Sequence, residues 1–158
     1  ELGGTLALTN QPGQGACFRL ELPLTLAIID ALIVRVSGQT FAAPLAPVRE
    51  VLQFRRDELI AIDRGLLLRW RGGALPLVWL ARRFGLPDSG PERLSALVIG
   101  EGAGAAGLVV DAIAQKREIV VRPIADRLAR TPGIAGATEL GDGRVVLILD
   151  AQALLERA

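Results

Sequence analysis

Apolar residues occur along most of the chain in short runs, and glycine, proline or polar residues separate one run from the next. Short runs rich in valine, isoleucine and leucine are typical of β-strands and fall below the usual length of a helix. Many such runs at intervals of roughly 8–12 residues indicate a β-sandwich or small β-barrels. The expected strands are 5–10, 17–22, 32–36, 40–43, 66–71, 74–78, 97–99, 108–110, 119–122, 137–140 and 144–149.

Turn residues join several of these runs into hairpins. Ser37-Gly38 separates one pair of runs and Gly72-Gly73 another, and glycine tolerates the positive φ angles of a tight hairpin turn. The loop 11–15 joins the first two runs, and Gly141-Asp142-Gly143 joins the last two. The hairpins around Gly72 and Gly141 share an outline of strand, turn, strand and helix, which indicates a doubled architecture.

Helical signals are few and short. The segment 79–84 has room for one or two helical turns, and Gly85 and Pro87 end it. Near the end of the chain, Asp150 can cap a helix over 151–157 by accepting hydrogen bonds from backbone N–H groups. The fold is therefore expected to be mainly β.

The apolar content, 51% of the chain, changes this picture by implying contacts with other molecules. The longest apolar stretch, 22–36, contains Pro23, Asp30 and Arg35, and it is shorter than the roughly 20 apolar residues of a membrane-spanning helix. The chain starts at Glu1 with no charged and then apolar leader, so we expect no signal peptide. We expect part of the apolar surface to bind partner proteins.

Charge and composition exclude several classes of function. The net charge of +1 gives no basic surface for nucleic acid or an anionic membrane. With no histidine and only Cys17, the chain can form neither an internal disulfide nor a cysteine–histidine metal site, and a reducing cytoplasm suits this usage. Asp111 and Asp150 follow apolar runs and are interpreted as caps of turns or helices, so we expect no catalytic residue and no metal. Cys17 is expected to be a small buried residue.

Two stretches resemble a known family. Gly13-Gln14-Gly15-Ala16-Cys17-Phe18, followed by Leu22-Pro23-Leu24-Thr25-Leu26-Ala27-Ile28, resembles the last strand of the ATP-binding domain of CheA-type chemotaxis histidine kinases as it enters the regulatory domain. The rest of the chain resembles the CheW-like domain that follows in those kinases. Its matching segments are 41–45, 48–51, 71–78, 108–111, 134–137 and 143–150.

The resemblance implies a carboxy-terminal part of such a kinase, with 1–28 as a remnant of the ATPase domain and connector and 29–158 as the CheW-like regulatory domain. It implies an all-β CheW-like fold of two intertwined five-stranded SH3-like barrels with short helices. In the family this domain binds a CheW-like coupling protein and the cytoplasmic tips of chemoreceptors, so that receptor state regulates the kinase. The resemblance also implies a cytoplasmic location at receptor arrays on the inner face of the membrane, reached through partners and without direct insertion.

Gly13 and Gly15 are interpreted as a vestigial ATPase loop, because no lysine or helix start follows them to hold phosphate. Ala16 and Cys17 stand where kinases of this type usually carry threonine or serine, so the resemblance implies a weakened nucleotide pocket in the parent. We expect no cofactor in this chain, whereas ATP and Mg belong to the parent kinase. The chain alone is expected not to be an enzyme.

Glu50 and Arg71 are charges in otherwise apolar segments, and the family pattern carries a glutamate and an arginine at these places. We expect a cross-strand ion pair that either holds the fold or shapes a groove for a receptor tip. The other arginines, in the pairs 55–56 and 82–83, are expected on solvated faces. Trp70 is expected in the core, and Trp79 half exposed.

Side chains after Glu50 alternate along a strand, so Leu52 and Phe54 share one face and Val51 lies on the other. One face presents large apolar groups, either inward to the core or outward to a partner; both alternatives stay open. The rest of the parent kinase is a further expected partner. The candidate partner-binding residues are Val48, Glu50, Val51, Leu52, Phe54, Arg71, Gly72, Ile134 and Ala135.

Three alternatives for the function remain at this point. The same module occurs in kinases of other pathways, such as surface motility, and in hybrid kinases with a receiver domain after the regulatory domain. The third is a fragment that retains ATP binding.

Overall fold

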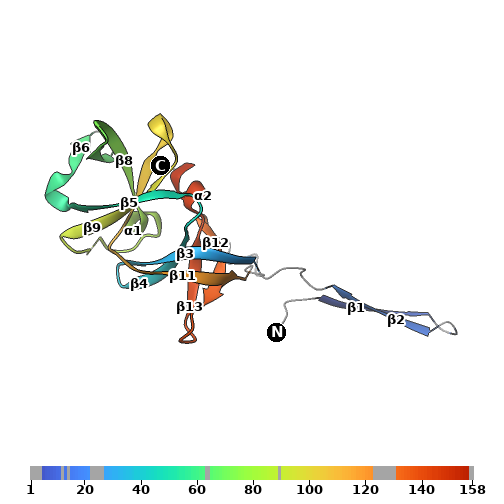
Figure 1. The fold of residues 1–158 in the computed structure, drawn as a ribbon. Coiled ribbons are helices and arrows are strands. Elements are labelled where there is room, and N and C mark those ends of the chain that lie inside the picture. Colours follow the sequence, from blue (N-terminus) through green and yellow to red (C-terminus); the bar gives the residue numbers. More distant parts are fainter. Residues whose placement is uncertain are drawn as a thin grey trace.

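A computed structural model describes residues 5–11, 13, 15–21, 27–62, 65–88, 90–122 and 131–156. The predicted segments from Leu22 to Leu26 and at Arg157 lie outside these residues. The described chain is mainly β, as expected, and it forms an isolated hairpin and two larger sheets (Figure 1). The hairpin pairs β1 (Thr5–Gln11) with β2 (Gly15–Glu21) in antiparallel register.

The first larger sheet closes into a five-stranded barrel, called the first barrel below. Its strand order is β11-β3-β4-β13-β12. The two outer strands meet through Arg122 and Ala137, whose backbones exchange N–H···O bonds of 2.9 and 3.0 Å. The strands are β3 (Ala27–Val36), β4 (Gln39–Pro44), β11 (Ala112–Val121), β12 (Ile134–Glu139) and β13 (Val145–Leu149). Because β3 begins at Ala27, the predicted boundary after residue 28 falls inside a strand of this barrel.

The second larger sheet, called the second barrel, has the order β5-β9-β10-β8-β7-β6. It contains the five strands that the fold requires and one short addition, β6, which the sequence pattern did not predict. A short 3-10 helix, η1 (Arg56–Glu58), joins β5 to β6, and η2 (Gly102–Gly104) lies between β9 and β10. The strands are β5 (Val48–Arg55), β6 (Ile60–Ile62), β7 (Gly65–Trp70), β8 (Gly73–Trp79), β9 (Arg93–Ile99) and β10 (Ala106–Val110).

The chain passes through the first barrel twice and builds the second between these two passes, in agreement with the predicted intertwined fold. It enters the first barrel with β3 and β4, builds the second from β5 to β10, and returns to the first with β11 to β13. Each barrel contains one parallel pair of strands. In the first barrel β4 lies beside β13, and in the second β8 lies beside β10. The doubled outline of the two hairpins therefore reflects a real structural repeat.

Three clusters of buried apolar side chains hold the fold together. The largest lies between the barrels and includes Phe41 of the first, Leu97 of the second and residues of both helices. A second cluster fills the first barrel, and a third, centred on Leu75 and Val98, fills the second. Trp79 is buried in the shared core and Trp70 is only half-buried, which reverses the expectation for these two residues.

Two hairpins turn through the same two-residue geometry. Ser37 and Gly38 have φ angles of 49° and 77°, and Arg71 and Gly72 have 48° and 78°. Positive φ at both central positions is the type I′ pattern, whose twist matches that of the flanking strands. The turn at Ser37 is where the sequence predicts it. The other turn lies one residue earlier than predicted, because Gly73 pairs with Trp70 as the first residue of β8.

The two helices are short and follow equivalent hairpins. α1 (Leu80–Arg83) follows β8, and α2 (Ala151–Glu156) follows β13. Asp150 accepts a hydrogen bond of 3.1 Å from the backbone N–H of Ala153, so the predicted N-terminal cap of α2 is confirmed. In the part of the chain that the structure describes, neither helix has the length and apolar character needed to cross a membrane.

Asp88 lies in the segment between α1 and β9 and holds this segment against the second barrel. Its Oδ1 accepts hydrogen bonds from Arg56 Nη2 at 2.7 Å and from Trp79 Nε1 at 3.3 Å. Arg82 Nη2 lies 3.6 Å from the other carboxylate oxygen. Arg56 and Arg82 therefore both contact this carboxylate; Arg82 is 63% exposed, as the sequence predicted, whereas Arg56 is only 35% exposed.

Asp88 should make stability depend on pH in the acid range. The hydrogen bond from Arg56, aided by charge and by Trp79, lowers its pKa below the usual value. The unfolded chain therefore binds a proton more readily, so the stabilisation is present above the usual aspartate pKa and is lost as pH falls through the lower folded value. Asp88→Asn should cost about 1 kcal/mol at neutral pH and flatten this acid dependence.

Urea unfolding between neutral pH and the acid range measures this effect. Asp57→Asn is the control, because its carboxylate is 67% exposed and lies 3.4 Å from Arg55. An equal loss of acid dependence in both variants would contradict the role of Asp88.

Candidate interaction surfaces

Glu50 is the centre of a polar group at one end of the second barrel. It lies on β5 opposite Val98, a core residue, so its side chain is on the inner side of the sheet. Its Oε1 accepts a 2.6 Å hydrogen bond from Trp70 Nε1 and lies 3.2 Å from Arg71 Nη2. The Arg71 guanidinium also stacks 4.9 Å from the centroid of the Trp70 ring.

This arrangement ties the edge strand β5 to the turn between β7 and β8. The predicted contact between Glu50 and Arg71 is present, but Arg71 is a turn residue rather than a strand residue. Its side chain is 69% exposed against 29% for Glu50, so water screens the ion pair. The hydrogen bond from Trp70 is the better shielded part of the group. Gly72, the neighbouring candidate, is exposed in the turn.

The faces of β5 settle which of its residues can meet a partner. Phe54 is 3% exposed and Leu52 packs against the core, so the core alternative holds for both. Val48 lies opposite Ile99, beyond a register shift in β5, and is half-buried against the shared core. Val51 lies on the opposite face and is 41% exposed. Of the apolar candidates on this strand, Val51 alone presents an open side chain, in line with the predicted alternation.

An exposed apolar surface that the sequence did not predict covers the outer side of the second barrel. Ile60 and Ile62 of β6 are 38% and 47% exposed, and Ile60 lies opposite Leu67 of β7, which lies opposite Pro76 of β8. Opposed residues share a face of a sheet, so these four form one surface, the β6–β8 patch. The apolar side chains at alternate positions in 60–62 could have indicated this strand from the sequence.

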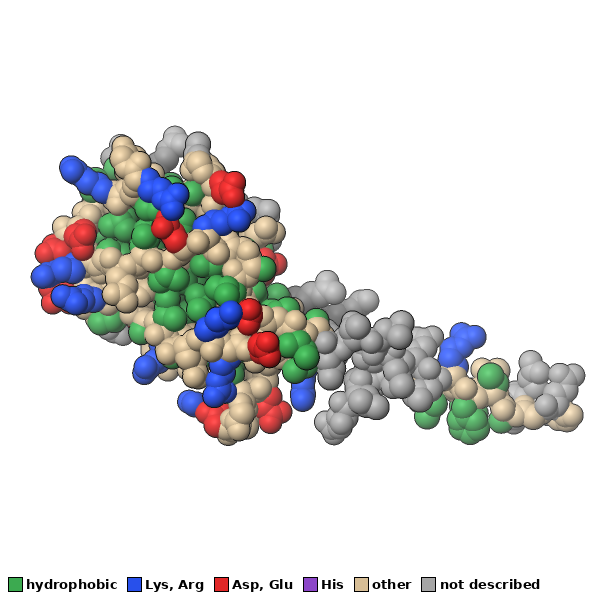
Figure 2. Space-filling model, in the orientation of Figure 1, with side chains coloured by type: hydrophobic (Ala, Val, Ile, Leu, Met, Phe, Trp, Pro, Cys, Tyr) green, Lys and Arg blue, Asp and Glu red, His purple; other side chains and the backbone are tan. Residues whose placement is uncertain are grey.

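The first barrel carries a comparable surface on its corresponding hairpin. Val145 and Leu147 of β13 are 71% and 39% exposed. They lie opposite Glu139 and Ala137 of β12, and Ala135, a predicted candidate, is exposed on the same strand. We call Ala135, Ala137, Val145 and Leu147 the β12–β13 patch; Ile134 is half-buried against the shared core. Figure 2 shows apolar side chains that reach the surface in areas separated by charged ones.

A hollow of about 390 Å³ lies where the two barrels meet. Pro47 and Arg49 line one side, Ile99 and Gly100 contribute the end of β9, and α2 contributes Gln152 and Leu155. Elsewhere, across the described residues, no group of three or more histidine, cysteine, aspartate or glutamate side chains is placed to hold a metal ion.

The family model of the CheW-like domain matches residues 30–158. The chain belongs to the CheW-like domain family. A chemotaxis protein CheA from Salmonella typhimurium is 40% identical over 157 residues, which cover 98% of this chain and 23% of that protein. A chemotaxis protein CheA from Rhizobium meliloti is 39% identical over 158 residues, which cover 98% and 21% respectively. The chain thus spans about a fifth of the length of these curated relatives, and the predicted resemblance to the carboxy-terminal part of CheA-type kinases is confirmed.

A solved structure supports the fold of this CheW-like domain. The scaffolding protein TtCheW from Thermoanaerobacter tengcongensis matches it with a TM-score of 0.66 at 17% identity, covering 81% of this chain and 92% of that one. At this identity the likeness shows the fold alone.

The hairpin of β1 and β2 lies outside the residues that the CheW-like domain model matches. Leu6 and Leu8 are two residues apart and so share one face of β1, and Phe18 lies opposite Leu8. These three side chains are 60–68% exposed. The expectation of a buried Cys17 is wrong, because its side chain is exposed on β2. Gly13 and Gly15 have φ angles of 80° and 109° and serve the loop between the strands.

The polar group at Glu50 should contribute to the stability of the CheW-like domain. Glu50→Ala leaves the Trp70 N–H without its acceptor and should lower the free energy of unfolding by about 1–2 kcal/mol. Glu50→Gln keeps an oxygen for that hydrogen bond and should cost less. Urea unfolding of Glu50→Gln, Arg71→Gln and the double variant should show coupling of about 0.5 kcal/mol, since the pair is partly exposed.

Arg69→Gln is the matched control, because Arg69 is exposed on the same hairpin and lies opposite Ala74. Its effect should add to that of Glu50→Gln without coupling. Strict additivity for Arg71→Gln as well would rule out an energetic role for the ion pair.

Proposed function

We propose that the chain is the docking and regulatory module of a chemotaxis histidine kinase. It binds a CheW-like coupling protein and the cytoplasmic tips of chemoreceptors, and it passes receptor state to the kinase in two-component signal transduction. The family match and the CheA relatives support a coupling role, and the two exposed apolar patches support protein binding as its physical basis. The module acts in the cytoplasm and reaches receptor arrays through its partners.

The β6–β8 patch is the proposed site for the coupling protein, and its exposed isoleucines are the observation that carries this assignment. Ile60 and Ile62 remain 38% and 47% open to solvent although they sit on a short strand at the edge of the sheet. Burying them against another protein removes apolar area from water, which is the main driving force of association. The free edge of β6 also allows a partner strand to add to the sheet.

Substitution in the patch tests the assignment. Ile62→Ser should weaken binding of a purified CheW-like coupling protein by more than about tenfold, equivalent to roughly 1.4 kcal/mol, in titration calorimetry. Ile28→Ser is the matched control, because Ile28 is 63% exposed on β3 of the other barrel. Equal affinity of both variants and the unchanged chain would overturn the docking site, and thermal unfolding checks that the variants stay folded.

The hollow between the barrels is the proposed site for a helical receptor tip. Its floor contains the buried Ile99, and its walls come from the segment around Pro47 and from α2, so a helix can lay an apolar face into it. Gln152 is exposed on the wall, and Gln152→Arg should obstruct the hollow without disturbing the core. Co-sedimentation with a receptor-tip fragment should fall for Gln152→Arg and stay unchanged for Gln53→Arg, which places the same change on an exposed site of β5. Unchanged co-sedimentation of Gln152→Arg would exclude this hollow.

The chain itself is proposed to carry no kinase chemistry. It has no histidine to accept phosphate, and Gly13 and Gly15 stand in an exposed hairpin loop. Titration calorimetry with ATP separates this proposal from a fragment that retains nucleotide binding, since a measurable affinity of the chain for ATP would favour the fragment. The apolar side of the β1–β2 hairpin is the proposed contact with the rest of the parent kinase.

A further inference from the structure

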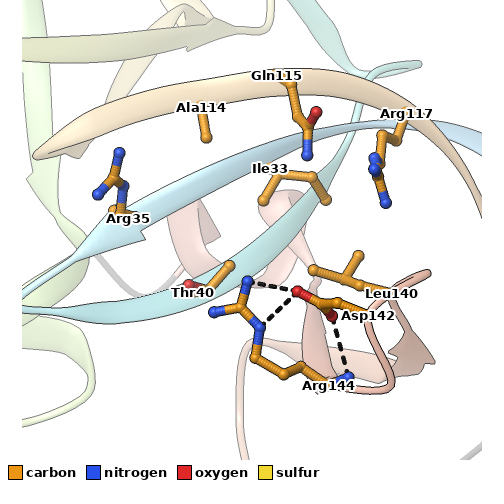
Figure 3. A pocket seen from close by; sticks show the side chains of 9 residues that line it. All are labelled: Ile33, Arg35, Thr40, Ala114, Gln115, Arg117, Leu140, Asp142 and Arg144. Atoms are coloured by element: carbon orange, nitrogen blue, oxygen red, sulfur yellow. Dashed lines mark hydrogen bonds and ion pairs between the residues drawn. The ribbon is translucent and has the colours of Figure 1, made fainter.

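The mouth of the first barrel forms a pocket of about 330 Å³ with an apolar floor and a basic rim (Figure 3). Inward positions on the strands explain this composition. Ala31 and Ile33 belong to the core inside the barrel, so Arg35, two residues further along β3, continues the same inward face at the open end. On β11, Ile119 is in the core and Arg117 continues toward the mouth.

The charges around the pocket are unbalanced. Its lining contains three arginines, Arg35, Arg117 and Arg144, and one carboxylate, Asp142. Asp142 is already paired with Arg144, whose Nε and Nη2 lie 2.7 and 2.6 Å from Oδ2. This contact lowers the pKa of Asp142 and keeps the carboxylate charged. The other ion pairs described in this barrel join Lys116 to Asp30 and Arg122 to Glu139, which leaves two guanidinium charges at the mouth without a described counter-ion.

The two uncompensated arginines stand on opposite sides of an apolar surface. Figure 3 shows Ile33 between Arg35 and Arg117, with Leu140 beneath Arg117. Arg117 lies opposite Ala31 in the register, four residues before Arg35 on β3, so the two backbones are separated by about 13 Å along the strands. A Cβ added at Gly141 would lie 3.7 Å from Arg117 Nη1, so this guanidinium is close to the β12–β13 turn.

We propose that this mouth binds a dicarboxylate whose two carboxylates are joined by a short apolar stem. One carboxylate pairs with Arg35 and the other with Arg117, while the stem covers Ile33. Glutarate, whose two carboxylates are joined by three methylene carbons, is a simple compound of this class. Planar guanidinium groups match carboxylates through two parallel hydrogen bonds, and the Gln115 amide on the pocket wall offers another donor. A free diacid and a pair of glutamate side chains on a protein segment share this chemistry.

Chemical-shift titrations of the full chain test the proposal. Glutarate at fixed ionic strength should shift the Ile33 and Gln115 backbone signals to saturation. Arg35→Gln and Arg117→Gln should each weaken the affinity by roughly tenfold, since each removes one charged hydrogen-bonded contact. Arg69→Gln, an exposed arginine of the second barrel, should leave the affinity unchanged. Because no partner protein is present, the result is independent of the docking proposed above.

A second arm titrates an acetylated and amidated Glu-Ala-Glu tripeptide. Tighter binding of glutarate assigns the pocket to a free diacid, and tighter binding of the tripeptide assigns it to an acidic protein segment. Inorganic phosphate tests whether the ligand needs two separate anionic groups, because a single small anion cannot reach both arginines. Three outcomes would each overturn the proposal. The first is that neither glutarate nor the tripeptide gives saturable chemical-shift changes. The others are that Arg69→Gln weakens the affinity as much as the pocket variants do, and that phosphate binds as tightly as glutarate.

Discussion

Two short parallel strand pairs are the constraint on which the rest of the molecule depends. Parallel neighbours require a long crossover connection. Between β8 and β10 this connection contains α1 and β9 of the second barrel, and between β4 and β13 it contains all the strands of the second barrel. The register of Leu108 beside Val78 orders the strands of the second barrel, and the register of Leu147 beside Phe41 joins the two separate segments of the first barrel. The first barrel therefore cannot be completed by a continuous piece of this chain, whereas residues 48–110 supply every strand of the second.

The intertwined path also explains the large shared core. Strands in the middle of each sheet use both faces: one fills its own barrel, and the other packs against the opposite barrel and the helices. Ile33 and Val34 show the division, because Ile33 lies inside the first barrel and Val34 lies in the shared core. Such strands are apolar at consecutive positions, which accounts for much of the apolar content of the chain. Further apolar side chains lie on the surface, in the β6–β8 and β12–β13 patches.

Local chemistry made some of the structure predictable from the sequence. Ser37-Gly38 marks its turn because glycine suits positive φ, and Asp150 marks the start of α2 because its carboxylate accepts backbone hydrogen bonds. Other features depend on distant partners. Trp79 is buried because it lies between α1 and the shared core, and its N–H meets Asp88 nine residues later. The sequence placed Phe54 on one face of β5, but only the pairing with Leu94 shows that this face is the inner one.

The two barrels share the same arrangement of strands, but their open ends differ in charge. In the second, β5 brings Glu50 to Trp70 and Arg71. The Glu50 carboxylate balances the charge of Arg71 and links the edge strand β5 to the turn between β7 and β8. In the first, the corresponding strand β11 brings Arg117 to a turn whose own charges, Asp142 and Arg144, already balance each other. The same path of the backbone thus yields a neutral closure in one barrel and an excess of positive charge in the other. Because the fold is carried by the parallel pairs and the shared core, side chains at these ends can diverge without loss of the architecture, and this separates the residues that hold the domain from those that are free to bind.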